Sequence, residues 1–323
     1  MTKFEGARLR GKVSETVQYQ AEPGNGGVRR PRRQTLPHFT DRLPLGDQGL
    51  LVSPFCLGMV RSPEAVSAAF DAGINFFFLS ADMHWPLYEP LRCGLKDLLR
   101  RGGGIRDEIV LGAACYPTQP DFCTYPFQEV LDAAPEFKRL DLLIAGGVYS
   151  RDFPERLPVY QQHRRGNFLG SRAIGMSFHD RQTALTAISQ RLVDIAYIRY
   201  NPSHPGARDD LFPYVDCSIR SLLFNFKSTL GYVSPDLQAE LGLPGDIYWQ
   251  PAITDYYRFA LTRPEFDGLL VAPGTSNEVA ALAAALELGP LEPDEDQFLR
   301  DLALVASGGA RVAAEQPAID SGK

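Results

Sequence analysis

The chain has 323 residues, of which 44% are apolar, so it is long enough to bury one large core. Its 33 basic and 39 acidic residues give a formal net charge of −6, which argues against nucleic acid or an anionic membrane as the main partner. The five cysteines include no CxxC pair, which predicts reduced thiols in a cytoplasmic protein. No stretch approaches the ~20 apolar residues that cross a bilayer, so we expect a soluble protein.

The two ends of the chain differ from its middle. Residues 1–40 are rich in Gly, Arg, Gln and Pro and show little periodicity, which predicts a polar N-terminal extension. Between Arg42 and Ser53, turn residues separate two short apolar runs, which is typical of a hairpin. Residues 311–323 are expected to form a short C-terminal tail.

Short apolar runs alternate with amphipathic stretches over residues 41–310. The predicted strands are residues 55–58, 74–79, 109–113, 142–145, 172–176, 195–200, 221–226 and 268–271, and the clearest predicted helices are 63–72, 89–101, 181–191, 254–262 and 277–287. Near-continuous apolar strands indicate a parallel sheet buried on both faces. Eight strands, each followed by a helix or crossover, predict a (β/α)8 TIM barrel. An open doubly wound sheet is less favoured because no GxGxxG motif follows the first strand.

Several segments resemble a known family, and they occur in the family's order. They include Gly-Ile-Asn-Phe-Phe at 73–77, Arg-Asp-Glu-Ile-Val-Leu at 106–111, Tyr-Asn-Pro at 200–202 and Ala-Pro-Gly-Thr-Ser at 272–276. Together they are similar to aldo-keto reductases from about residue 43 to residue 286. The resemblance implies hydride transfer from NADPH to a carbonyl compound. In the family a Tyr donates the proton, a Lys and an Asp lower the pKa of that Tyr, and a His orients the substrate oxygen.

The catalytic pattern of the family is broken in this chain. On the alignment that the motifs give, the Asp, Tyr, Lys and His are all absent. The aligned positions are, in that order, Phe78 or Leu79, His84 or Trp85, Ala114, and Ala145 or Gly146. Any turnover therefore requires other proton donors.

The resemblance also implies a cofactor site. NADP(H) is the expected cofactor, and the alternative is that the protein binds no cofactor. Its expected contacts are Ser177, Tyr197, Lys227, Gly274, Thr275 and Ser276. Tyr197 replaces the family's Gln, and Phe178 replaces the Asn of its Ser-Asn pair. The turn at 273–277 opens a predicted helix, whose free N–H groups either bind a phosphate or only cap the helix. The Arg that the family places one turn later is missing, with Glu278 nearby.

Other residues after the predicted strands could carry acid–base chemistry. Asp82 and His84 lie two apart in extended backbone, so they share a side, and a His beside a carboxylate is a general acid or base near neutral pH. Tyr116 is an alternative proton donor, as is Tyr149. Cys115 is either a nucleophile activated by His84 or, as for most buried cysteines, inert packing.

Two further features bear on the ligand. His179 with Asp82 and His84 would make a metal-binding set in principle, but nothing in the spacing requires it, and we expect no metal. The expected substrate is a small aromatic or apolar molecule, because aromatic residues should line the mouth of the barrel. These residues are Phe78, Trp85, Phe178, Tyr197 and Trp249.

Three functions remain open from the sequence. The first is a divergent NADP(H)-dependent oxidoreductase acting on a small carbonyl compound. The second is a non-redox enzyme of specialised metabolism (a cyclase, lyase or hydrolase) that uses Asp82 and His84. The third is a pseudoenzyme that binds a partner through residues 1–40, a segment that could also mediate self-association. Fold alone does not choose among them, because function depends on the site.

Overall fold

The computed structural model describes residues 33–308 except residues 83 and 219. Eight parallel strands form a closed barrel in the order β10-β3-β4-β5-β6-β7-β8-β9. They are β3 (Phe55–Leu57), β4 (Phe76–Ser80), β5 (Val110–Cys115), β6 (Leu142–Val148), β7 (Ala173–Phe178), β8 (Ile195–Arg199), β9 (Leu222–Phe226) and β10 (Gly268–Val271). Each predicted strand overlaps one of these, and the predicted (β/α)8 barrel is confirmed.

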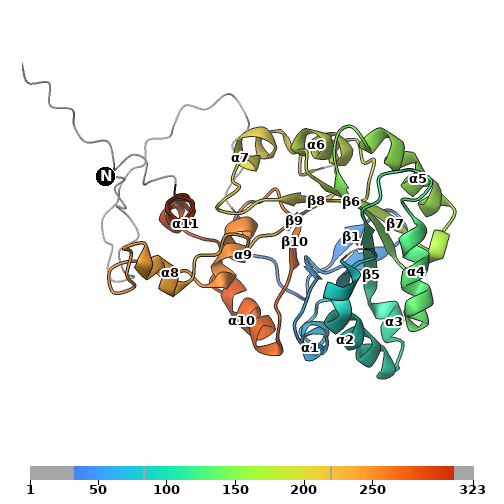
Figure 1. Cartoon of the computed structure of the whole chain (residues 1–323), viewed down its shortest axis with the longest axis horizontal. Coiled ribbons are helices and arrows are strands. Elements are labelled where there is room, and N and C mark those ends of the chain that lie inside the picture. Colours follow the sequence, from blue (N-terminus) through green and yellow to red (C-terminus); the bar gives the residue numbers. More distant parts are fainter. Residues whose placement is uncertain (1–32, 83, 219, 309–323) are drawn as a thin grey trace, which may run out of the picture.

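Helices form the outer layer of the barrel (Figure 1). The α-helices are α1 (Glu64–Asp71), α2 (Glu89–Arg100), α3 (Ile105–Glu108), α4 (Tyr125–Ala133), α5 (Phe153–Arg165), α6 (Arg181–Ser189), α7 (Ala207–Asp210), α8 (Pro235–Glu240), α9 (Ile253–Leu261), α10 (Ser276–Leu286) and α11 (Pro293–Ala306). Short 3-10 helices are η1 (Trp85–Tyr88), η2 (Pro135–Phe137), η3 (Phe168–Gly170) and η4 (Phe212–Tyr214). The five clearest predicted helices correspond to α1, α2, α6, α9 and α10. Several others, including α4, α5, α8 and α11, start with Pro at the first or second position, where its missing N–H costs nothing.

The predicted hairpin precedes the barrel and is confirmed. β1 (Leu43–Leu45) pairs antiparallel with β2 (Leu50–Val52). Asn75, just before β4, joins the hairpin to the barrel: its side chain accepts the Ser53 N–H at 2.7 Å and donates to the Leu51 carbonyl at 2.9 Å. This end of the barrel, where the strands begin, is therefore tied to the hairpin, and the loops that follow the strands lie at the other end.

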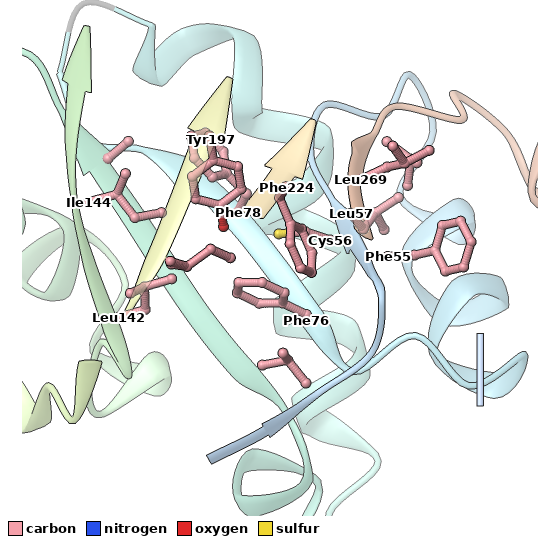
Figure 2. Packing of buried hydrophobic residues seen from close by; sticks show 14 of the residues in the cluster. Phe55, Cys56, Leu57, Phe76, Phe78, Leu142, Ile144, Tyr197, Phe224 and Leu269 are labelled. Carbon is pink, nitrogen blue, oxygen red and sulfur yellow. The ribbon is translucent and has the colours of Figure 1, made fainter. Parts of the chain in front are cut away.

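The barrel interior is largely apolar and aromatic (Figure 2). Phe76, Phe78, Tyr197 and Phe224 contribute their rings to it, and the Tyr197 ring lies 6.1 Å from that of Phe78 and 5.9 Å from that of Phe224. Successive side chains in a strand point to opposite faces, so the neighbours of these residues face the surrounding helices. The interior is thus a packed core, and a ligand site can form only at the rim where the strands end.

The described part of the chain contains no helix that is both long enough and apolar enough to cross a membrane. Residues 1–32 and 309–323 lie outside the described residues, so the expected extension and tail, and the boundaries at 41 and 310, stay predictions.

Candidate active site

Asp82 and His84 lie together in the segment that follows β4. His84 Nδ1 is 3.6 Å from Asp82 Oδ1, with 41% of the His84 side chain and 14% of the Asp82 side chain exposed. The second carboxylate oxygen accepts the backbone N–H of Tyr116 at 2.6 Å, which fixes Asp82 at the end of the neighbouring strand β5. His84 Nδ1 is buried and makes no hydrogen bond, so the solvent-exposed part of the ring consists of its other atoms. Nε2 is therefore the ring nitrogen that a ligand can reach.

The Tyr116 ring lies against His84, with ring centroids 4.9 Å apart and planes at 59°. It also covers Gly146: a Cβ at that position would be 2.6 Å from the ring carbon Cε1 of Tyr116. Burial raises the pKa of Tyr116, and the charges of Asp82 and Cys115 raise it further. Tyr116 is therefore a neutral hydrogen-bonding group, and no positive charge among the described residues makes its phenol more acidic.

Cys115 does not face His84. It is fully buried, and its thiol donates to the Cys123 carbonyl and lies 3.4 Å from the Tyr160 hydroxyl of α5. Burial raises the pKa of Cys115 to about 12. The couple between Cys115 and His84, one of the two alternatives left open by the sequence, is thus not formed, because Cys115 and Tyr116 point to opposite sides of the strand. The alternative reading of Cys115 as inert packing agrees with these contacts.

The positions at which the sequence resemblance would place three of the family's tetrad residues lie in β4, β5 and β6, and they carry no polar side chain; they are Phe78 or Leu79, Ala114, and Ala145 or Gly146. Phe78 is 6% exposed and Ala114 is 1% exposed, and Gly146 lies under Tyr116. β6 has an irregular register between Ala145 and Val148, next to Gly146. Bulges of this kind often occur beside active sites, where they redirect side chains.

The ends of β6 and β7 form a second wall of the mouth. The Gly147 N–H donates to Ser177 Oγ at 2.8 Å. Tyr149, 43% exposed, stacks on His179 with centroids 4.7 Å apart and planes at 25°. Burial, and then the charges of Arg199 and Lys227, lower the pKa of His179, while Asp152 raises it. His179 lies on this wall, stacked on Tyr149.

Among the described residues, no group of three or more His, Cys, Asp or Glu side chains could hold a metal ion.

Not all of the expected aromatic residues line the mouth. Phe178 packs on Phe153 of α5, and Trp249 packs on Phe298 of α11, so both belong to the outer layer. Tyr197 is 1% exposed, and its hydroxyl is buried inside the barrel, where its neighbour is the Cys56 thiol (Figure 2). The residue two positions later on β8, Arg199, is exposed at the rim and lies on the same side of the strand.

The turn at 273–277 opens α10, as expected, and its Gly274 N–H is already occupied. Glu278 Oε2 accepts that N–H at 2.7 Å, and its other oxygen pairs with Arg61, which follows β3. The Arg61 guanidinium also packs on Gly274, where a Cβ would be 2.6 Å from its Cζ. Thr275 caps the helix by accepting the Glu278 N–H at 3.3 Å. A phosphate at the Gly274 N–H would have to displace a carboxylate of the same charge sign.

Sequence reasoning missed Arg156 of α5. Its guanidinium is fully buried and donates to the Gly146 carbonyl at 3.0 Å and to the Cys115 carbonyl at 3.2 Å. Asp152 lies one helical turn before it, 3.6 Å from the guanidinium. Arg156 therefore holds the ends of β5 and β6 next to the mouth. The i, i+4 spacing of Asp152 and Arg156 was the available signal, but such pairs are usually at the surface.

No protein-family model matches the chain, and no curated protein does. Solved structures do. A putative aldo-keto reductase from Pseudomonas aeruginosa is 20% identical, with 79% of this chain and 98% of that one covered and a TM-score of 0.56. A holo aldo-keto reductase from Bacillus halodurans is 15% identical, with 81% and 96% covered and a TM-score of 0.60. An aldo-keto reductase from a deep-sea metagenome is 13% identical, with 81% and 94% covered and a TM-score of 0.58. The chain has the fold of the aldo-keto reductases.

Proposed function

We propose that the protein is a divergent oxidoreductase of the aldo-keto reductase type that acts on a small carbonyl compound. The observation that carries the proposal is the placement of His84, supported by Asp82, at the mouth of this barrel, where a proton donor is needed. The barrel shared with reductases, one of them a holo form, supports the redox part.

His84 acts as the general acid in this proposal. In its protonated form the imidazole donates a proton from Nε2 to the carbonyl oxygen, and Asp82 beside Nδ1 stabilises the positive charge. The Tyr116 N–H holds Asp82 in place, and the Tyr116 ring limits how far the imidazole can turn. Tyr116 is the alternative donor, although its raised pKa makes it a weaker acid.

A nicotinamide cofactor would supply the hydride. The Glu278 carboxylate occupies the Gly274 N–H in the turn at 273–277, so we propose that NAD(H) is bound at least as well as NADP(H). Ser177, partly exposed at the end of β7, remains the residue expected to contact the nicotinamide.

The test is direct binding of NADH and NADPH, followed by reduction of aromatic aldehydes. We expect saturable binding in the micromolar range and turnover that falls about 100-fold or more in His84→Ala, the usual contribution of a general acid. His38→Ala, a change at a histidine before the hairpin that pairs with Glu287, is the matched control and should retain full activity. The absence of binding at millimolar concentrations of both cofactors would exclude the redox function.

A second function is favoured by the contacts of Glu278. If the carboxylate closes the turn to every dinucleotide, Asp82 and His84 would serve a non-redox enzyme, such as a lyase, cyclase or hydrolase. Turnover without any nicotinamide, lost in His84→Ala, would identify this function.

A further inference from the structure

We propose that a cavity in the outer layer of the barrel binds a small organic phosphate. The cavity lies between α2, α3 and η2, which contact one another, and the two α-helices are adjacent in Figure 1. Its volume of about 480 Å³ falls within the ~300–1,000 Å³ that is typical of small-molecule sites. The charged residues of its lining are four basic and two acidic ones, namely Lys96, Arg100, Arg106, Lys138, Asp107 and Glu136.

The cavity is separate from the candidate active site. Residues 102–108 precede β5 and residues 135–138 precede β6, so both segments lie at the end of the barrel where the parallel strands begin. Asp82 and His84 follow β4 and lie at the opposite end. A ligand in the cavity therefore does not compete with a ligand at the mouth, and the inference does not depend on the proposed function.

The two acids of the lining already have partners within the protein. Glu136 pairs with Lys96 at 2.9 Å, and Asp107 pairs with Arg139 at 3.0 Å. Burial raises the pKa of Glu136, but the Lys96 hydrogen bond and the charges of Lys96 and Arg100 lower it overall, so Arg100 acts on the same space. Neither carboxylate is therefore left to neutralise the remaining cations of the cavity.

Lys138 and Arg100 are those remaining cations. The Lys138 side chain is exposed, and no acidic side chain among the described residues lies within 4 Å of its ammonium group. Arg100 is 73% exposed and pairs with Asp97 of its own helix, which is 58% exposed. Exposed pairs of this kind contribute little to stability, so a ligand can replace Asp97 at small cost. Both positive charges are therefore available to an anion.

Arg106 adds positive charge from the buried side of the cavity. Its side chain is 6% exposed and donates to Asp141 at 2.9 Å. Arg139 and Arg172 bind the same carboxylate, at 2.9 Å and 3.1 Å. Three guanidinium groups thus meet one buried carboxylate, and Asp107 on Arg139 balances only one more of them. The cluster keeps an excess positive charge next to the cavity.

The rest of the lining is apolar or glycine. Leu99 and Ile105 are half-buried and offer an apolar surface. Gly102 and Gly104 have a left-handed backbone, with φ of 74° and 85°, and a Cβ added to either would have no heavy atom within 4 Å. These glycines are therefore required by the conformation of the turn and not by close packing, and the space beside the turn is open.

These features together define the ligand class. A phosphate monoester carries a charge of about −1.5 to −2 at neutral pH, which matches two available cations. Arginine forms paired hydrogen bonds with phosphate oxygens, and lysine binds phosphate as a point charge. An organic body on the phosphate would contact Leu99 and Ile105. The cavity therefore suits a phosphate monoester with an apolar or aromatic body.

The test is calorimetry of the full-length protein with phenyl phosphate at pH 8 and low salt. Phenyl sulfate has the same shape with one negative charge less, and inorganic phosphate lacks the ring. We expect phenyl phosphate to bind roughly fivefold more tightly than either, or better. Lys138→Met and Arg100→Gln should each weaken its binding about three- to tenfold. Arg101→Gln removes a neighbouring arginine that pairs with Asp71 and does not line the cavity, so it is the matched control and should have no effect.

Several results would overturn the inference. Unchanged affinity in both Lys138→Met and Arg100→Gln would place the phosphate elsewhere on the protein, and displacement of phenyl phosphate by NADH would place it at a cofactor site. Equal affinity for phenyl sulfate or for inorganic phosphate would remove the proposed ligand class, as would the absence of binding at millimolar concentrations. Loss of phenyl phosphate binding in the double variant, with NADH binding or its absence unchanged, would support the cavity whatever the outcome for the redox function.

Discussion

Replacing Glu278 by Gln tests whether its carboxylate weakens the binding of a cofactor phosphate at the start of α10. The substitution keeps the size of the side chain and removes the charge that now lies on the Gly274 N–H and on Arg61. It leaves Arg61, whose side chain is 70% exposed, without its counter-ion. We therefore expect Glu278→Gln to bind NADPH more tightly and NADH with unchanged affinity.

The size of the effect follows from the exposure of the site. Glu278 is 40% exposed, so the interaction is screened by water, where two unit charges 4 Å apart interact by about 1 kcal/mol. A phosphate monoester carries a charge of about −1.5 to −2, so the repulsion removed is roughly 1.5–2 kcal/mol. Since about 1.4 kcal/mol corresponds to a tenfold change, NADPH affinity should rise about 10- to 30-fold.

The assay is a titration of protein fluorescence with NADPH and NADH at low ionic strength, repeated at high salt, where the gain should shrink. Glu287→Gln removes the same charge at the other end of α10 and should change neither affinity. An unchanged ratio of NADPH to NADH affinity in Glu278→Gln would refute the assignment of this turn as a closed phosphate site.

Three further predictions concern groups around the barrel. Iodoacetamide at pH 8 should modify the exposed Cys93 and Cys217 but not Cys115, because Cys115 is buried and its pKa is about 12. Mass spectrometry would locate the labels, and rapid labelling of Cys115 would contradict its burial. Tyr197→Phe removes a buried hydroxyl whose partner is the Cys56 thiol, a weak hydrogen-bonding group, so the free energy of unfolding should change by less than about 1 kcal/mol in urea titrations, and a larger loss would contradict this assignment. Arg156→Met should lower the free energy of unfolding by roughly 3 kcal/mol or more, because the Gly146 and Cys115 carbonyls and Asp152 lose a buried partner. A loss below about 1 kcal/mol would show that the guanidinium is dispensable for stability.

The sequence predicted the barrel because its strands are short apolar runs and its order of motifs is that of a known family. It did not single out α5, which is polar on most sides and contains Pro158, so neither periodicity nor propensity indicates a helix there.

For the candidate site, local geometry was predictable and contacts distant in sequence were not. Asp82 and His84 lie close together as expected, but in a turn closed by the Trp85 N–H on the Asp82 carbonyl at 2.7 Å, and not in the extended backbone that the spacing argument assumed. The alternation of side chains in a strand separates Cys115 from Tyr116, so strand parity already argued against a Cys115–His84 couple. The contact between Arg61 and Glu278 joins residues 217 positions apart, and no local pattern could indicate it.

The fit of Tyr116 over Gly146 couples these two positions of the rim. A Cβ at position 146 would lie 2.6 Å from Cε1 of the Tyr116 ring, so any larger side chain there requires the ring to move. Removing the Tyr116 ring would in turn leave a space beside His84, against which it now packs. A redesign of this part of the rim therefore has to replace both residues together.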